Sequence, residues 1–482
     1  MPRKYGISRV ENSLLQIAPD LAGPAGDGIR TRLRSLRSSA KAQASMRNAL
    51  YSTAEYIALP LTMLLATPFL LHRLGLLQFG LWMLASAAVT SSNLISTGFG
   101  DAAIKYASMY RAEGDGERFQ HALRVNLTIN LLLGGLLTLV LWFGSPYAVR
   151  SIFKIEVALR SDAIVAFRIG SAILLIRCMD TVLTSALRSY ERYAPAVQIS
   201  IISRTATVLA ACFLVWRGYG IVAIMAATLC IVASAAAVQM FVVRVVARIW
   251  LIPSFNRTAF AEVFHFGCFS WLQALAGCIF NQADRLLIGA LLGAASVGYY
   301  SVCVQAAQPI HGLIAAGLHF LFPHLSARLS KAPATKLRRV VASILLLNVI
   351  AATLMCVPVV FFSKLILRLW MGAAFAAQTW MILSLIALSF GFLSLNVTAH
   401  YALLALTQVR LVALLNLAGG VAMLIAMFLL APRFGLVGVA TGRLLYGPIT
   451  LLMYRRLYCL LSPAQEPSST FGRLALTSTE SH

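Results

Sequence analysis

Long apolar stretches, separated by short polar or glycine-containing connections, recur along nearly the whole chain. Each is close to the roughly 20 residues that a helix needs to cross the hydrocarbon core of a bilayer. The pattern therefore predicts an all-α, polytopic membrane protein with about twelve transmembrane helices. The predicted spans are 48–71, 77–99, 121–143, 161–187, 195–216, 220–248, 262–291, 296–325, 337–361, 375–402, 409–431 and 436–460.

One short phrase occurs twice, at the connections that follow the first and the seventh of these spans. It begins at Leu74-Gly75 as Leu-Gly-x4-Gly-x-Trp, and returns 218 residues later at Leu292-Gly293 with tyrosine in the aromatic position. A second echo pairs residues 219–223 with 434–438, at an offset of 215 residues. Two matches at nearly one offset indicate homologous halves in the same order. Six spans per half predict two parallel six-helix repeats around a central cavity.

The chain is accordingly expected to divide into four parts. Residues 1–47 form a basic tail, 48–257 the first six-helix lobe, 258–461 the second lobe, and 462–482 a polar tail. Both tails lack the apolar residues that a packed core requires, so they are predicted to be disordered.

Composition supports the membrane interpretation. Hydrophobic residues make up 59% of the chain and charged residues 12%, whereas soluble domains have about 45–50% and about 25%. The net charge of +24 would suit nucleic acid, but most Lys and Arg flank apolar spans and no nucleic-acid-binding motif is present. Their excess falls in the segments that share a side with the termini, which predicts that both termini are cytoplasmic.

Catalytic chemistry has little support in the sequence. The eight cysteines fall mostly inside apolar spans with no Cys-x-x-Cys pair, which favours neither a disulfide framework nor a metal site. No phosphate-binding lysine loop, nucleophile elbow or hydrolytic zinc motif occurs. We expect a protein that is not an enzyme, without a cofactor or a metal.

The opening of each half carries further motifs. They are Pro60, Pro68-Phe69-Leu70-Leu71, Leu74-Gly75, Phe79-Gly80-Leu81-Trp82, Gly98-Phe99-Gly100 and Lys105-Tyr106 in the first half, and Asp284-Arg285-Leu286-Leu287-Ile288-Gly289, Gly293 and Val297-Gly298-Tyr299-Tyr300-Ser301 in the second. In order and spacing, over roughly residues 46–460, they resemble the polysaccharide-transport flippases of the multidrug/oligosaccharidyl-lipid/polysaccharide exporter superfamily. The basic tail is longer than is usual in that family.

The resemblance implies twelve helices in two lobes in a bacterial inner membrane. It also implies a substrate, an undecaprenyl-pyrophosphate-linked oligosaccharide, that is flipped by alternating access for O-antigen or exopolysaccharide biosynthesis. Membrane lipids and the polymerase or export machinery are the partners expected on the same ground.

Four arginines lie inside predicted spans: Arg168 and Arg177 in the fourth, Arg204 in the fifth and Arg443 in the twelfth. An intramembrane charge costs at least about 2.5 kcal/mol and usually faces a wet cavity or a partner. Arginine pairs bidentately with phosphate oxygens, so these four are the candidate substrate-binding residues. At the repeat offset, Arg204 corresponds to Gly419, so the charges are not repeated with the scaffold.

Each arginine also has a structural interpretation. Arg177 and Asp180 are three residues apart and can pair along one helix face. Arg168 and Arg443 lie near span ends, where a long side chain can extend to the membrane surface. Arg204 has no acid on its own helix, and its structural alternative is a pair with Glu55 or Asp180 of another helix.

Three acids are the candidates for coupling to an ion: Glu55, Asp180 and Asp284. A buried carboxylate can carry a proton or bind a cation. The alternative is a fixed counter-ion to an arginine or, for Asp284, a packing role between the lobes. Polar side chains that could contact sugars include Gln305, Asn396 and His400, and Tyr300 and Tyr401 are among the aromatic candidates, with helix packing as the alternative.

Two other functions stay open at this stage. A multidrug or small-molecule exporter of the same superfamily would favour acids in its cavity. A membrane polysaccharide polymerase or ligase would need a long outer loop to hold donor and acceptor, and the connections here are short.

Overall fold

The computed structural model describes residues 60–91, 107, 109–110, 113–190, 193–247, 253–254, 275, 277–318, 334–406 and 408–461. Regular secondary structure in these ranges is entirely helical, as the apolar pattern predicts. Backbone contacts place residues 55–482 in one compact unit. Glu55 and the predicted tails 1–47 and 462–482 lie outside the described residues, and the division into lobes at residue 257 stays a prediction.

The first half contains the helical segment Pro60–Ser91 and four long or medium helices. They are α3 (Gly116–Tyr147), α4 (Arg160–Ser189), α5 (Tyr193–Trp216) and α6 (Ile221–Ala247), with a π-helical turn at Ala148–Ile152 and a 3₁₀ turn at Val157–Leu159 between α3 and α4.

The second half opens with a π-helical turn at Ile279–Ala283, which runs directly into α8 (Asp284–Leu291). The helices that follow are α9 (Ala294–Leu318), α11 (Ala334–Phe361), α12 (Ser363–Met371), α13 (Ala373–Ala405), α14 (Val409–Arg443), α15 (Tyr446–Leu451) and α16 (Met453–Leu460).

Within the described ranges, seven helical segments are long and apolar enough to cross a bilayer. They are Pro60–Ser91, Gly116–Ile152, Ala194–Trp216, Ile221–Val245, Leu337–Phe361, Ala373–Ala405 and Val409–Leu460. The protein is therefore a multi-pass helical membrane protein. The count of twelve stays a prediction, because parts of the predicted spans 48–71, 77–99, 262–291 and 296–325 lie outside the described residues.

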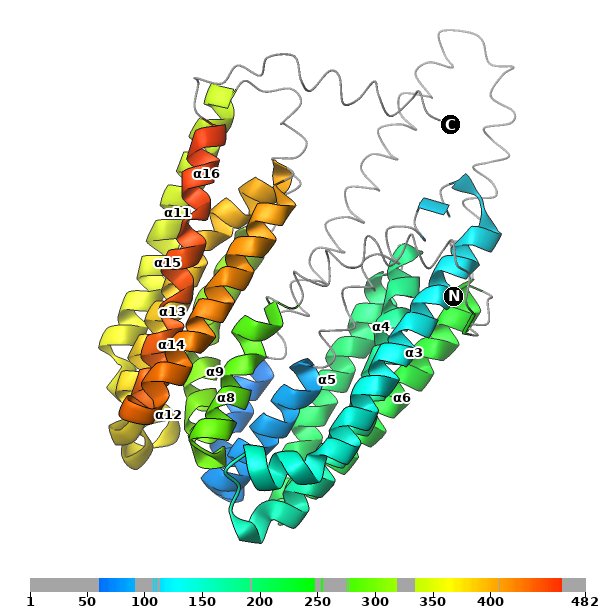
Figure 1. The fold of residues 1–482 in the computed structure, drawn as a ribbon, viewed down its shortest axis with the longest axis vertical. Helices are drawn as coiled ribbons and strands as arrows, with labels where there is room; N and C mark the ends of the chain where they lie inside the picture. Colours follow the sequence, from blue (N-terminus) through cyan, green and yellow to red (C-terminus); the bar gives the residue numbers. More distant parts are fainter. Residues whose placement is uncertain are drawn as a thin grey trace, which may run out of the picture. The chain divides into compact units, whose positions relative to one another are not determined.

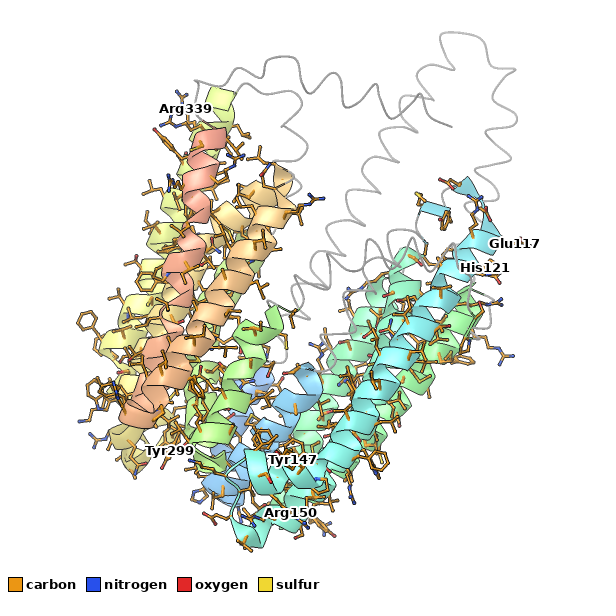
Figure 2. All side chains as sticks on the ribbon, in the orientation of Figure 1. Glu117, His121, Tyr147, Arg150, Tyr299 and Arg339 are labelled. Atoms are coloured by element: carbon orange, nitrogen blue, oxygen red, sulfur yellow. The ribbon has the colours of Figure 1, made fainter. Side chains whose placement is uncertain are left out.

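Helix α3 illustrates how a spanning helix is specified. Asp115 caps its start by accepting a hydrogen bond from the backbone N–H of Arg118 at 3.0 Å, which satisfies an otherwise unpaired donor. The 32 residues rise roughly 48 Å, more than the roughly 30 Å of a hydrocarbon core. Figure 2 shows Glu117 near the start and Tyr147 at the far end, so polar groups mark both ends of the apolar stretch.

Glycines in the left-handed region make the connections that the repeated phrase predicts. Gly75 has φ of 77° and Gly293 has φ of 84°, a conformation that costs glycine nothing. In the second echo the left-handed residues are Gly218 and Gly435, so the sequence match of Gly220 with Gly435 is off by two residues. The corrected offset is 217, closer to the 218 of the first echo.

The helices of each half pack mainly with one another. In the first half α4 lies between α3 and α6, and α5 packs on α6 (Figure 1). In the second half α13 is the central helix and contacts α9, α11, α12 and α14. This arrangement explains why α13 buries residues along its whole length, whereas α3 exposes apolar side chains such as Leu132 and Phe143.

The two halves meet at the repeated glycine phrase itself. A Cβ on Gly80 would collide with the backbone carbonyl of Ala294, and a Cβ on Gly298 would lie 2.9 Å from the carbonyl oxygen of Leu76. Ala294 and Gly298 each lie 218 residues after Leu76 and Gly80, so the contact is reciprocal, as in an interface between two identical subunits. The repeated phrase thus encodes a close backbone approach between the halves as well as a turn.

Candidate functional site

One buried cluster holds the charged pair Asp284 and Arg443. Asp284 begins α8 and Arg443 ends α14, and the side chain of each is 1% exposed. Arg443 Nη1 donates a hydrogen bond to Asp284 Oδ2. The Tyr300 hydroxyl donates to the same carboxylate oxygen at 2.7 Å and accepts from Arg443 Nη1 at 2.9 Å. The charge of Arg443 is therefore compensated inside the second half.

Aromatic rings complete the surroundings of Arg443. Its guanidinium carbon lies 4.3 Å from the ring centroid of Phe280 and 4.9 Å from that of Phe390. Desolvated contacts of this kind add to the stability of the cation. The alternative in which Arg443 extends to the membrane surface is wrong, because the side chain is enclosed by partners of its own half. As Asp284 is its counter-ion, neither group is open to a ligand in this structure.

A second charged cluster lies in the first half and is built differently. Arg177 and Asp180 on α4 form the predicted ion pair, with Nη1 and Oδ2 3.8 Å apart and side chains 25% and 24% exposed. Arg204 on α5 is half-buried and near enough to Arg177 for the two cations to repel each other. Among the residues that the structure describes, no ion pair joins Arg204 to Asp180. Two cations thus share one acid at a partly open site.

Arg168 lies three turns before Arg177 on α4, apart from that cluster. Its guanidinium carbon is 5.6 Å from the ring centroid of Trp142 on α3. Its Nε is buried and has no hydrogen-bond partner among the described residues. Stacking on Trp142 gives Arg168 a packing role between α3 and α4 that sequence spacing does not reveal. Glu55, the remaining candidate, lies outside the described residues.

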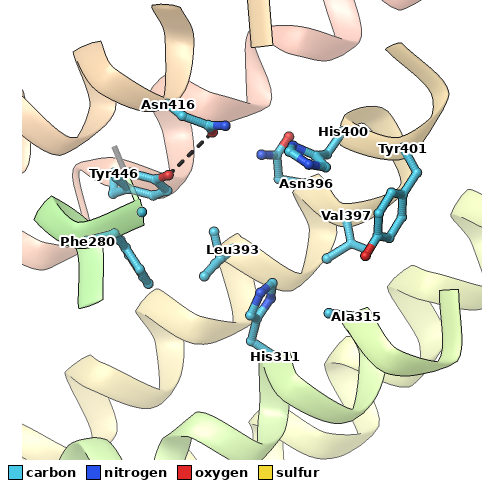
Figure 3. A pocket seen from close by; sticks show the side chains of 11 residues that line it. Phe280, His311, Ala315, Leu393, Asn396, Val397, His400, Tyr401, Asn416 and Tyr446 are labelled. Atoms are coloured by element: carbon cyan, nitrogen blue, oxygen red, sulfur yellow. Dashed lines mark hydrogen bonds between the residues drawn. The ribbon is translucent and has the colours of Figure 1, made fainter. Parts of the chain in front are cut away.

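The larger of the cavities found in the described ranges lies within the second half and measures about 200 Å³. Its lining residues come from α9, α13, α14, α15 and the turn before α8: Gly277, Phe280, His311, Ala315, Leu393, Asn396, Val397, His400, Tyr401, Asn416 and Tyr446. Figure 3 shows His311, Asn396 and His400 facing the same space. The predicted cavity between the halves is a separate expectation and stays a prediction.

The cavity carries polar groups without charge. Tyr446 donates a hydrogen bond to Asn416 Oδ1 at 3.3 Å (Figure 3). Asn396 is 4% exposed, and neither its Oδ1 nor the Nδ1 of His311 has a hydrogen-bond partner. Asn396 and His400 are four residues apart and share a helix face, so their proximity was predictable. His311 was missed, because nothing local links it to α13.

Similarity to solved structures defines the class. The fold matches an inward-facing multidrug resistance MATE family transporter of the MOP superfamily, with a TM-score of 0.73, 15% identity and coverage of 86% of this chain and 99% of that one. It also matches the lipid II flippase MurJ in an inward closed conformation, with a TM-score of 0.65, 16% identity and coverage of 84% and 88%. The chain has the fold of a MOP-type membrane transporter.

The family follows from sequence. The family described as polysaccharide biosynthesis protein matches residues 45–329, more than half of the chain, and the protein belongs to it. The "Putative O-antigen transporter" of Shigella flexneri is 26% identical over 212 residues, which cover 43% of this chain and about half (49%) of that protein. The "Uncharacterized membrane protein EpsK" of Bacillus subtilis (strain 168) is 23% identical over 419 residues, 81% of this chain and 77% of that protein.

Proposed function

We propose that this protein is a flippase that moves an undecaprenyl-pyrophosphate-linked oligosaccharide across the bacterial inner membrane, for O-antigen or exopolysaccharide biosynthesis. The observation that carries the proposal is the half-buried pair of arginines, Arg177 and Arg204, which share the single acid Asp180. Uncompensated positive charge in an apolar helix bundle is costly, and an anionic head group would offset that cost.

The proposed mechanism is alternating access. The head enters from the cytoplasm, Arg177 and Arg204 bind the pyrophosphate, and the halves rock about their contact to open the other side. The reciprocal approach of Gly80 and Gly298 supports this step, because a symmetric, side-chain-free contact suits two bodies that change their angle. Both termini are proposed to be cytoplasmic.

Coupling to a proton or to the membrane potential falls to the acids under this proposal. Asp180 is the stronger candidate, since its side chain is 24% exposed beside two cations. Asp284 is the weaker one, since Arg443 and Tyr300 already occupy its carboxylate. Arg168, stacked on Trp142, would line the path at another depth.

The test is reconstitution in liposomes with a fluorescent polyprenyl-pyrophosphate sugar, followed by the rate at which the head reaches the other leaflet. Arg204→Ala should lower that rate at least about tenfold, and Arg204→Lys should restore part of it, because the charge returns without the planar fork. Wild-type protein that leaves the sugar lipid in place but exports a cationic dye under a proton gradient would favour a multidrug exporter. Sugar transfer to an acceptor would favour a polymerase or ligase.

A further inference from the structure

The cavity of the second half is separate from the arginines that the proposed function uses. Its lining residues all come from residues 277–446, whereas Arg177 and Arg204 belong to α4 and α5. None of the described residues that line it is Lys, Arg, Asp or Glu. The nearest charge, Arg443, stands behind Phe280 and is neutralised by Asp284. The cavity therefore suits neither an anion nor a cation.

The polar groups of the cavity are arranged for an uncharged ligand that donates and accepts hydrogen bonds. The Asn396 carbonyl oxygen and His311 Nδ1 are buried without a partner, and an unpaired buried polar group costs about 1–3 kcal/mol. An amide oxygen is an acceptor, while imidazole and amide nitrogens supply donors. Hydroxyl groups satisfy both kinds of partner.

Aromatic rings provide flat apolar walls between these polar groups. Phe280 and Tyr446 have ring centroids 4.4 Å apart, and Tyr401 faces the cavity from α13 (Figure 3). The volume of about 200 Å³ is below the roughly 300–1,000 Å³ of sites for drug-sized molecules. A single six-membered ring that bears hydroxyl groups fits this combination of size, polar groups and flat walls.

We infer that this cavity is a monosaccharide subsite, which binds one uncharged sugar ring of the lipid-linked head while the arginines of the first half bind the pyrophosphate. The inference rests on the proposed function and adds that recognition is divided between the halves by charge. Asn396, His311 and His400 would contact hydroxyl groups, and Tyr446 would present its ring and hydroxyl. Specificity for the sugar would then be set in the second half alone.

The test measures equilibrium binding to the full-length protein in nanodiscs. The probes are farnesyl pyrophosphate without a sugar, and four farnesyl-pyrophosphoryl sugars that carry glucose, galactose, N-acetylglucosamine or N-acetylgalactosamine. At least one sugar probe should bind about tenfold more tightly than bare farnesyl pyrophosphate. Asn396→Leu should abolish this advantage and leave binding of the bare probe within about twofold.

Two further variants keep the result interpretable. Tyr446→Phe removes only a hydroxyl, and should reduce the sugar advantage even if Asn396→Leu fails to fold. Asn126→Leu is the matched control, since Asn126 is a fully buried asparagine of α3 in the first half, and it should keep the advantage.

The outcomes separate this inference from the function it rests on. If bare farnesyl pyrophosphate binds through Arg204 but no sugar adds affinity, or if Asn396→Leu and Tyr446→Phe both keep the advantage, the subsite is refuted and the flippase proposal stands. If wild-type protein binds none of the five probes, the proposed function itself fails.

Discussion

Arg443 in the second half and Arg177 in the first are the same residue type in the same kind of helix bundle, with opposite surroundings. Arg443 is 1% exposed, with a carboxylate, a phenol and two aromatic rings around it. Arg177 is 25% exposed, 3.8 Å from its acid, with a second cation nearby. A charge whose partners are all supplied by the protein holds the fold together, whereas a charge that is only partly matched can bind a ligand.

The largest effect should come from breaking the buried pair. Asp284→Leu leaves Arg443 buried and uncompensated, which should lower the free energy of unfolding by about 3–5 kcal/mol. The double variant Asp284→Leu/Arg443→Met should recover most of that loss, because it removes both charges. Unfolding by denaturant in detergent micelles measures both.

The matched control for that experiment is the exposed pair of Asp115 and Arg118, with side chains 37% and 69% exposed. Asp115→Asn keeps much of the helix cap and should cost no more than about 1 kcal/mol. Equal losses for Asp284→Leu and Asp115→Asn would contradict the structural role given to the buried pair.

Substitution at the contact between the halves should have an intermediate effect. Gly80→Ala and Gly298→Ala each insert a methyl group against the backbone of the other half, which should cost about 1–3 kcal/mol and slow flipping. Gly135→Ala on α3 is the control, because its Cβ would meet nothing within 4 Å; it should be neutral or slightly stabilising. If all three variants behave alike, the halves do not meet at the repeated phrase.

The smallest effect on stability should follow Asp180→Asn. A long, partly exposed ion pair contributes about 0–1 kcal/mol, so unfolding should change little. The same variant leaves Arg177 and Arg204 with no shared acid, so bare farnesyl pyrophosphate should bind a few-fold more tightly. Titration of that probe checks the prediction, and weaker binding would mean that Asp180 is needed to orient Arg177.

Several features of the fold were predictable because their causes are local. An apolar stretch of spanning length predicts a transmembrane helix wherever it occurs, and the turn at Gly75 and Gly293 follows from a repeated glycine. The pair of Arg177 and Asp180 follows from a spacing of three residues on one helix. In each case the residues that cause the structure are neighbours in the sequence.

The buried cluster and the cavity depend on contacts that sequence spacing does not carry. Asp284 and Arg443 are 159 residues apart, and the same arginine reads equally well as a substrate-binding residue or as one near a membrane surface. The cavity brings His311 of α9 to His400 of α13 in the same way. The sequence offers the residues for a polar site, but their meeting depends on how the helices pack.

The most direct test of the division between the halves compares two variants in one binding assay. Arg204→Gln and the double variant Asp284→Leu/Arg443→Met are titrated with farnesyl pyrophosphate in nanodiscs. The division predicts about a tenfold loss of affinity for Arg204→Gln and an affinity within about twofold of wild type for the double variant. Unchanged binding by Arg204→Gln together with a loss in the folded double variant would contradict it, and would place the anion site at Arg443.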